Sequence, residues 1–255
     1  MSFLTFCTKT LKDPGYPFRK LAWEVLQHTP EKIVRSKTRH GDLFYSSRDQ
    51  GIGRLLHLTK EFDYGDIERL VQLTTSARNQ NRPGRGMVLD IGANIGTVLI
   101  PLLRDGLFDR GIAIEPDPKN FQILEQNIAI NGLGERVAAL QIGLSSQSGK
   151  MTLFRSATSH GDHRVQSETT DAVADRIKVE VRIKTLDDAL TEQNISAADI
   201  SLICLDTQGH EAHVLRGASA ILKHGPALLI EFWPWGLIKQ GSDPKEVLVM
   251  LEASY

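Results

Sequence analysis

Residues 88–97 read Val-Leu-Asp-Ile-Gly-Ala-Asn-Ile-Gly-Thr, and this stretch decides the fold class of the chain. The apolar run Met87–Ile91 predicts a strand that is buried on both faces, and Gly92 marks a tight turn into a helix. The next apolar run, Gly111–Glu115, predicts a second buried strand and ends in an acid 25 residues after Asp90. This order of strand, turn, helix and strand is typical of an α/β domain with a parallel sheet.

The same alternation continues toward the C-terminus. Helices are predicted within Gly92–Leu103 and at Pro118–Ile130, Leu186–Leu190, Ala212–Leu222 and Pro244–Ala253, and further core strands at Val137–Ile142, Leu202–Asp206 and Ala227–Phe232. Two more strands are predicted at Met151–Phe154 and Lys178–Ile183, and in the second of them charged and apolar residues alternate. We therefore expect a Rossmann-like α/β fold, with a mostly parallel sheet and helices on both of its faces.

Residues 1–85 are expected to form a mixed, largely helical extension before the main domain, residues 86–255. The breaker-rich stretch Asn79–Gly86 marks the boundary, and a helix at Asp66–Ser76 precedes it. The first predicted helix is Pro17–His28. Apolar side chains spaced to share one face of this helix are Phe18, Leu21, Ala22, Val25 and Leu26.

Composition excludes several classes of protein. Thirty Lys and Arg against 31 Asp and Glu leave a net charge of -1, so no field gathers polyanions and nucleic acid is not an expected partner. The two cysteines, Cys7 and Cys204, exclude a disulfide framework. The sequence has no run of 18 apolar residues, so it predicts no membrane span, and we expect a cytoplasmic protein.

The glycine turn predicts a nucleotide-like ligand. In an open parallel sheet the ligand lies off the carboxyl ends of the strands, above a glycine turn and beside an acid that binds ribose hydroxyls. Asp90, Gly92 and Glu115 occupy these places, although a turn that needs glycine only for its backbone would look similar. Asn94 stands where the dinucleotide fingerprint has its second glycine, which disfavours a diphosphate and therefore NAD. A phosphate-free adenosine cofactor, S-adenosylmethionine, tolerates Asn94, whose amide could bond its amino-acid part.

The combination of motifs resembles the FkbM family of class I S-adenosylmethionine-dependent methyltransferases. The motifs lie between Ile52 and Trp235 and comprise Leu89–Gly96, Ile114–Asp117, Asn127 with Asn131-Gly132, Thr185–Asp187, Leu205–Glu211 and Val214–Ala218. The resemblance implies methyl transfer to a hydroxyl oxygen of a sugar or small natural product. The cofactor-binding residues expected from the turn and the resemblance are Asp90, Gly92, Asn94, Gly96, Glu115, Pro116, Gly143 and Asp206, with Leu144 beside Gly143.

Candidates for the chemistry cluster after the strand at Leu202–Asp206. Asp206 is expected to hold the acceptor or take its proton, or else to cap the following helix. His210 is a rival base because histidine titrates near neutral pH, and His213 is a weaker one. Glu211 belongs to the same motif; alternatively, its carboxylate simply interacts favourably with the helix dipole in the first turn. Glu231 ends an apolar strand, so it either reaches the cleft or finds a partner.

No metal site is expected, because Asp206, His210 and His213 lack a second acid pair or another array of metal-ligand spacing. The polar stretch Arg155–Arg176 is expected to be a loop that is disordered or acts as a lid over the acceptor. His160, Asp162 and His163 are interpreted as polar loop residues. Asp117 is expected to cap the helix that begins at Pro118, with Asn120 close to it, and Trp233 and Trp235 to line the acceptor pocket or complete the core.

The resemblance also implies a seven-stranded sheet whose last two strands form an antiparallel edge. Only five core strands are predicted, and the residues after Phe232 are too few for two more. Either the strands near Met151 and Lys178 finish the edge, or a partner chain covers it in a homo-oligomer, or the sequence stops short of it. The alternatives to an active methyltransferase are an inactive S-adenosylmethionine-binding module and an NAD-dependent oxidoreductase.

Overall fold

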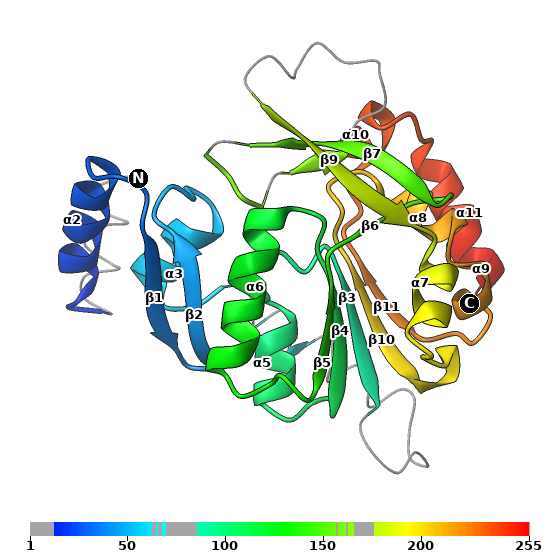
Figure 1. Ribbon diagram of the computed structural model, residues 1–255, viewed down its shortest axis with the longest axis horizontal. Helices are drawn as coiled ribbons and strands as arrows, with labels where there is room; N and C mark the ends of the chain where they lie inside the picture. Colours follow the sequence, from blue (N-terminus) through cyan, green and yellow to red (C-terminus); the bar gives the residue numbers. More distant parts are fainter. Residues whose placement is uncertain are drawn as a thin grey trace.

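The computed structural model describes residues 13–62, 65, 68–69, 86–156, 158–161, 163–165 and 176–254. A parallel sheet of five strands, in the order β11-β10-β3-β4-β5, lies at its centre (Figure 1). These strands are β3 (Met87–Ile91), β4 (Arg110–Ile114), β5 (Val137–Leu140), β10 (Ile200–Leu205) and β11 (Ala227–Ile230). The prediction of a Rossmann-like α/β fold is therefore confirmed.

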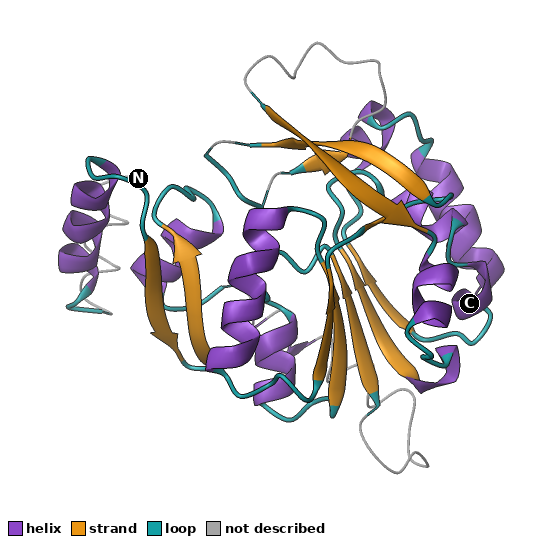
Figure 2. Ribbon diagram, in the orientation of Figure 1, coloured by secondary structure: helices purple, strands orange, loops and turns teal. Residues whose placement is uncertain are grey.

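Helices cover both faces of this sheet (Figure 2). One face carries α5 (Leu99–Arg104) and α6 (Pro118–Ile130), and the other carries α7 (Leu186–Glu192), α8 (Glu211–Arg216), α9 (Ser219–Leu222) and α11 (Pro244–Ser254). Because successive side chains of a strand point to opposite faces, Val88 packs in the core with α5 and α6, whereas Leu89 packs in the core with α7 and α8. All five residues of β3 are buried, as expected of a strand covered twice.

The C-terminal helices differ in detail from the sequence expectation. The predicted helix Ala212–Leu222 is two helices, α8 and α9, separated at Gly217-Ala218. A Cβ on Gly217 would lie 2.3 Å from the backbone oxygen of Ser145, so the chain bends where it passes close to another backbone. A short helical turn, η1 (Ala197–Asp199), precedes β10, and α10 (Pro234–Lys239) follows β11.

A smaller sheet lies beyond the carboxyl ends of the parallel strands (Figure 1). Its strands, in the order β6-β9-β7-β8, are β6 (Gly143–Leu144), β9 (Ile177–Lys184), β7 (Gly149–Arg155) and β8 (Arg164–Val165). The strands predicted near Met151 and Lys178 thus pair with each other, with Met151 opposite Val181. The idea that they complete the edge of the main sheet is wrong, because their apolar residues Leu153, Val181 and Ile183 form a separate core. Among the described residues, β11 pairs only with β10.

The N-terminal extension contains α2 (Tyr16–Gln27), a hairpin of β1 (Ile33–Thr38) and β2 (Gly41–Ser46), and α3 (Ile52–Thr59). Side chains at the C-terminal end of α6, from Asn127 and the C-cap residue Asn131, attach the hairpin to the main domain. The Asn127 amide accepts from the Phe44 nitrogen at 2.6 Å and donates to the Phe44 oxygen at 3.0 Å. The amide of Asn131 makes the equivalent pair of hydrogen bonds with the backbone of Asp42. The backbone of β2 is therefore hydrogen-bonded directly to the domain that carries the parallel sheet.

Helix α2 does not use the apolar face that its spacing indicated. Phe18, Leu21 and Val25 are 78%, 63% and 57% exposed, whereas Tyr16 and Trp23 are buried. The Trp23 ring lies 5.2 Å from the ring of His57 in α3 and 6.5 Å from that of Tyr45, so the helix packs through its buried aromatic side chains. The second predicted helix, Asp66–Ser76, and the boundary stretch Asn79–Gly86 lie largely outside the described residues. No helix in the described part of the chain is long and apolar enough to cross a membrane.

Candidate functional site

The glycine turn after β3 brings the ends of three strands together. Gly92 has φ +83, and a Cβ built on it would lie 1.8 Å from the backbone oxygen of Asp206. Its nitrogen donates to the oxygen of Ile114 at 2.9 Å. Glycine is required here on two counts, since an L side chain disfavours this φ and the end of β10 occupies the space of the side chain.

Glu115 lies beside this turn, on the same side of the sheet. Its Oε2 accepts a hydrogen bond from the Asn94 nitrogen at 2.9 Å, and its Oε1 accepts one from the Asp117 nitrogen at 2.8 Å. Burial raises the pKa of Glu115 to about 8, although both backbone donors favour the ionised form. Each carboxylate oxygen keeps a further lone pair for a ligand.

Two hollows open on either side of the glycine turn. The ribose hollow, as we name the first, is lined among others by Gly92, Asn94, Glu115, Pro116, Ile142, Gly143, Leu144 and Asp206. The acidic hollow, as we name the second, is lined among others by Ile52, Phe62, Asp90, Gly92, Asn94, Thr97, Asp206 and Glu231. Gly92, Asn94, Gly161 and Asp206 line both, so the hollows form one site that meets at the turn.

Asp90 is a buried acid in the wall of the acidic hollow. Burial, with a smaller contribution from the nearby Asp206 carboxylate, raises its pKa to about 7. Its Oδ2 has no hydrogen-bond partner among the described residues. A buried carboxylate oxygen without a partner is costly, so a positively charged or hydrogen-donating ligand group would stabilise it.

The segment Thr158–Gly161 folds over the ribose hollow. The backbone oxygen of His160 accepts a hydrogen bond from the Asn94 amide at 2.7 Å and another from the Asn120 amide at 3.0 Å. In this arrangement the Asn94 side chain holds the loop. His160 and His163 both line the ribose hollow, and Asp162 lies outside the described residues.

A buried ion pair holds the strand that leads into this segment. Asp117 accepts hydrogen bonds from the Lys119 and Asn120 nitrogens through Oδ1, so it caps α6. Its Oδ2 accepts from Arg155 Nε at 2.5 Å, at the end of β7. Burial lowers the pKa of the adjacent His163 to about 4, despite the charge of Asp117. The start of the predicted loop is therefore attached to the edge of the sheet that carries Glu115 and Asp117.

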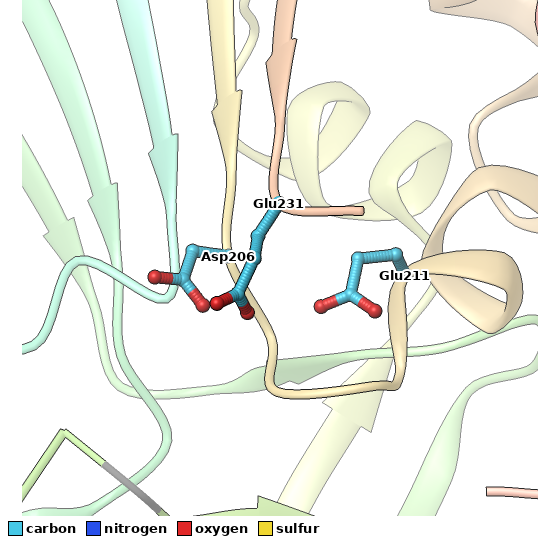
Figure 3. Close-up of side chains that lie close together, drawn as sticks. All are labelled: Asp206, Glu211 and Glu231. Carbon is cyan, nitrogen blue, oxygen red and sulfur yellow. The ribbon is translucent and has the colours of Figure 1, made fainter. Parts of the chain in front are cut away.

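The motif after β10 and the end of β11 bring three carboxylates together (Figure 3). Asp206 is exposed, and the amide of Gln208 joins it to Glu231 by donating to Asp206 Oδ1 at 2.7 Å and to Glu231 Oε2 at 3.0 Å. Glu211 is buried, and its Oε1 accepts from the nitrogens of Thr207 and Gly209 at 2.9 and 3.1 Å. Glu211 thus shapes the loop that presents Asp206. The residue at the N-cap of α8 is His210, so the alternative that Asp206 caps this helix is wrong.

The two histidines of this motif lie differently from the acids. His210 lines the ribose hollow and its Nε2 lies 3.1 Å from Ser145 Oγ. Burial lowers its pKa to about 3, so at neutral pH it is uncharged and a weak base. His213 stacks on it at 4.4 Å and does not line either hollow; its Nε2 lies 3.2 Å from the oxygen of Gln240.

Other predicted residues lie away from the hollows. Gly96 lines neither hollow. Its φ is +89 and a Cβ on it would lie 2.7 Å from Ile100 Cδ1, so glycine is needed here for the backbone conformation and for close packing. Trp233 and Trp235 lie 5.3 Å apart, also outside both hollows. The sequence did not single out Gln208, although it stands inside the quoted motif, and no local signal pointed to Ile52 or Phe62.

Comparison with known proteins gave consistent matches. The methyltransferase FkbM domain matches residues 90–255. Methyltransferase sdnD of Sordaria araneosa is 30% identical over 160 residues, which cover 54% of this chain and 62% of that protein. Hexuronic acid methyltransferase AglP of Haloferax volcanii is 30% identical over 165 residues, covering 64% of this chain and 59% of that protein. The crystal structure of methyltransferase FkbM from Methylobacillus flagellatus KT aligns with TM-score 0.44 and 20% identity, covering 79% of this chain and 45% of that chain.

The chain therefore spans about three fifths of the length of the two curated relatives. The matched domain begins at Asp90, inside β3, and includes Glu115, Asp206, Glu211 and Glu231. Every acid described above thus falls within the matched region. Ile52 and Phe62, which line the acidic hollow, lie before it.

Proposed function

The chain belongs to the FkbM methyltransferase family, and from this premise we propose that it is an S-adenosylmethionine-dependent O-methyltransferase acting on a hydroxyl group of a carbohydrate or small natural product. The observation that supports this most directly is the hydrogen bond between Glu115 and the glycine turn. The Asn94 nitrogen donates to the Glu115 carboxylate, so the ribose-binding acid and the turn share one hollow. The proposal makes this hollow the adenosine site.

The residues of the two hollows fit this cofactor. Glu115 would accept hydrogen bonds from the ribose hydroxyls, with Ile142 and Gly143 flanking the adenine. The unpartnered Oδ2 of Asp90, in the acidic hollow, would accept from the ammonium of the amino-acid part. Asn94 leaves no room at the turn for a diphosphate, which argues against NAD. When bound, the cofactor supplies a methyl group on an activated sulfonium.

Asp206 is positioned for the transfer because it lines both hollows. Displacement at a methyl carbon depends mainly on alignment of the acceptor oxygen with the carbon and its leaving group. The Asp206 carboxylate would orient the acceptor hydroxyl by accepting its hydrogen bond. It would take the proton late in the displacement, since a carboxylate is a weak base.

The acidic hollow favours a polyhydroxylated acceptor. Asp206 and Glu231 are exposed and present carboxylate oxygens toward it, and such oxygens accept hydrogen bonds from neighbouring hydroxyls of a sugar ring. Ile52 and Phe62 of the N-terminal extension add an apolar wall on which a ring face can pack. The name of the relative AglP, a hexuronic acid methyltransferase, supports a carbohydrate acceptor for this chain.

Two measurements test the proposal. Isothermal titration calorimetry should detect binding of S-adenosylmethionine and none of NAD; NAD binding without S-adenosylmethionine binding would overturn it. A radiolabelled methyl-transfer screen over sugars, uronic acids and small hydroxylated metabolites should then find an acceptor. Cofactor binding without transfer to any of them would favour an inactive binding module.

A further inference from the structure

Three carboxylates converge at the end of β10 and β11. One oxygen each of Asp206, Glu211 and Glu231 lies within 4.8 Å of the other two. The residues come from the end of β10, the first residue of α8 and the position after β11. Figure 3 shows the Glu231 carboxylate between those of Asp206 and Glu211. Asp206 and Glu211 form no ion pair with a basic side chain of the described residues. Like charges this close repel one another unless a cation or proton offsets them.

Glu211 supplies a second observation that points to a ligand. Its side chain is fully buried, and three donors, the Thr207 and Gly209 nitrogens and the Thr207 hydroxyl, all bind Oε1. Its Oε2 has no hydrogen-bond partner among the described residues, although it is also buried. The loop therefore holds this carboxylate by Oε1 and leaves Oε2 without a hydrogen-bond partner among the described residues. A buried polar atom without a partner calls for an explanation, and a bound ion beside this carboxylate would supply one.

We propose that Asp206, Glu211 and Glu231 bind a hard divalent cation of the Mg²⁺, Mn²⁺ or Ca²⁺ type. Ligand sets made only of carboxylate oxygens prefer such cations to softer metals. Oxygens bound to one ion at about 2.1 Å, as for Mg²⁺, or about 2.5 Å, as for Ca²⁺, lie at most about 4–5 Å apart. The observed spacing, within 4.8 Å, thus needs only small side-chain rotations.

The side-chain amide of Gln208 lies between two of the proposed ligands, Asp206 and Glu231. Its nitrogen donates hydrogen bonds to Asp206 at 2.7 Å and to Glu231 at 3.0 Å. These two bonds join the carboxylates as a bound cation would, but the amide carries no charge to offset theirs. Gln208 is partly exposed and can rotate away or offer its own amide oxygen as a ligand. Asp206 and Glu231 are exposed, so coordination positions remain open for water or for an acceptor oxygen.

The consequence for catalysis rests on the proposed function. A cation at Asp206 would lie at the junction of the two hollows, where the acceptor hydroxyl must bind. Coordination lowers the pKa of a bound hydroxyl, so Asp206 would not need to be a strong base. The sequence singled out each of the three acids but did not predict that they share a metal site, because Glu231 follows Asp206 by 25 residues and on a different strand.

The test is Mn²⁺ binding to the whole chain, measured from the loss of the free-ion signal in electron paramagnetic resonance. Wild-type protein should bind one Mn²⁺, with displacement by excess Mg²⁺ or Ca²⁺. Glu231→Gln and Asp206→Asn, both at exposed positions, should each weaken binding at least tenfold. Glu180→Gln is the matched control, because Glu180 is an exposed acid on β9 that pairs with Lys150, and it should bind Mn²⁺ as the wild type does.

The outcomes separate this proposal from the methyltransferase proposal. No Mn²⁺ binding by the wild type at millimolar concentration would overturn the cation site, as would equal affinity in all three variants. S-adenosylmethionine binding is measured on the same preparation without metal. Cofactor binding without Mn²⁺ binding would support the proposed function and overturn the cation site. Mn²⁺ binding without cofactor binding would support the cation site and overturn the proposed function.

Discussion

Substitution of Gly92 by alanine tests the geometry on which the candidate site depends. Gly92 has φ +83, where an L residue costs about 1–2 kcal/mol. The new Cβ would also lie 1.8 Å from the backbone oxygen of Asp206, so the ends of β3 and β10 must move apart. Overpacking of this kind costs about 1–3 kcal/mol, and we expect Gly92→Ala to lower the free energy of unfolding by about 2–5 kcal/mol in total.

Urea denaturation followed by circular dichroism measures this loss, and calorimetry with S-adenosylmethionine measures its effect on the site. The shift of the turn should displace the Asn94 nitrogen from Glu115, so we expect cofactor affinity to fall at least tenfold as well. Gly134→Ala is the matched control. Gly134 has no atom within 4 Å of a built Cβ and no positive φ, so its substitution should change stability by less than about 0.5 kcal/mol.

One result would refute the reasoning directly. If Gly92→Ala were as stable as Gly134→Ala and bound the cofactor normally, the close approach of Gly92 to Asp206 would not exist in the folded protein. A loss of stability without a loss of cofactor affinity would instead separate the turn from the binding site.

Three further predictions concern the acids. Glu115→Gln should weaken S-adenosylmethionine binding at least tenfold in calorimetry, because hydrogen bonds to a charged group contribute about 1.5–3 kcal/mol; unchanged affinity would remove Glu115 from the cofactor site. Asp206→Asn should lower the initial rate of methyl transfer more than tenfold with near-normal cofactor affinity, and an equal rate would exclude it from the chemistry. Burial raises the pKa of Glu115 from 4.5 to about 8 and that of Asp90 from 3.8 to about 7, so the unliganded fold holds protons that the unfolded chain releases. Its free energy of unfolding in urea should therefore fall as pH rises from about 4 to 8, and less steeply in Glu115→Gln; an equal slope in both proteins would contradict this.

Local signals in the sequence predicted the centre of the fold. An apolar run without alternation, such as Met87–Ile91, predicts a strand covered on both faces, and the structure buries each of its residues. Glycine at the turn and an acid at the end of the next strand predict a ligand edge, because parallel strands end on the same side of a sheet. These features depend on neighbours in the sequence, and the parallel sheet follows the predicted strands closely.

Long-range packing decided what the sequence could not. The apolar face of Pro17–His28 was misleading, since the helix instead packs through Trp23 against Tyr45 and His57. The strands near Met151 and Lys178 were predicted, but their pairing with each other rather than with β11 depends on register across more than twenty residues. The same holds for the His160 oxygen, which lies 66 residues from Asn94 in sequence and accepts its hydrogen bond in the fold.

The sequence by itself determined the alternation of strands and helices, the glycine turn and the family, because each is encoded in a short stretch of adjacent residues. Only the tertiary structure brought Asp206, Glu211 and Glu231 within 4.8 Å of one another and joined the two hollows at Gly92. The reason is that side chains from separate strands meet only after the sheet has set their register. Local propensity carries no information about that register.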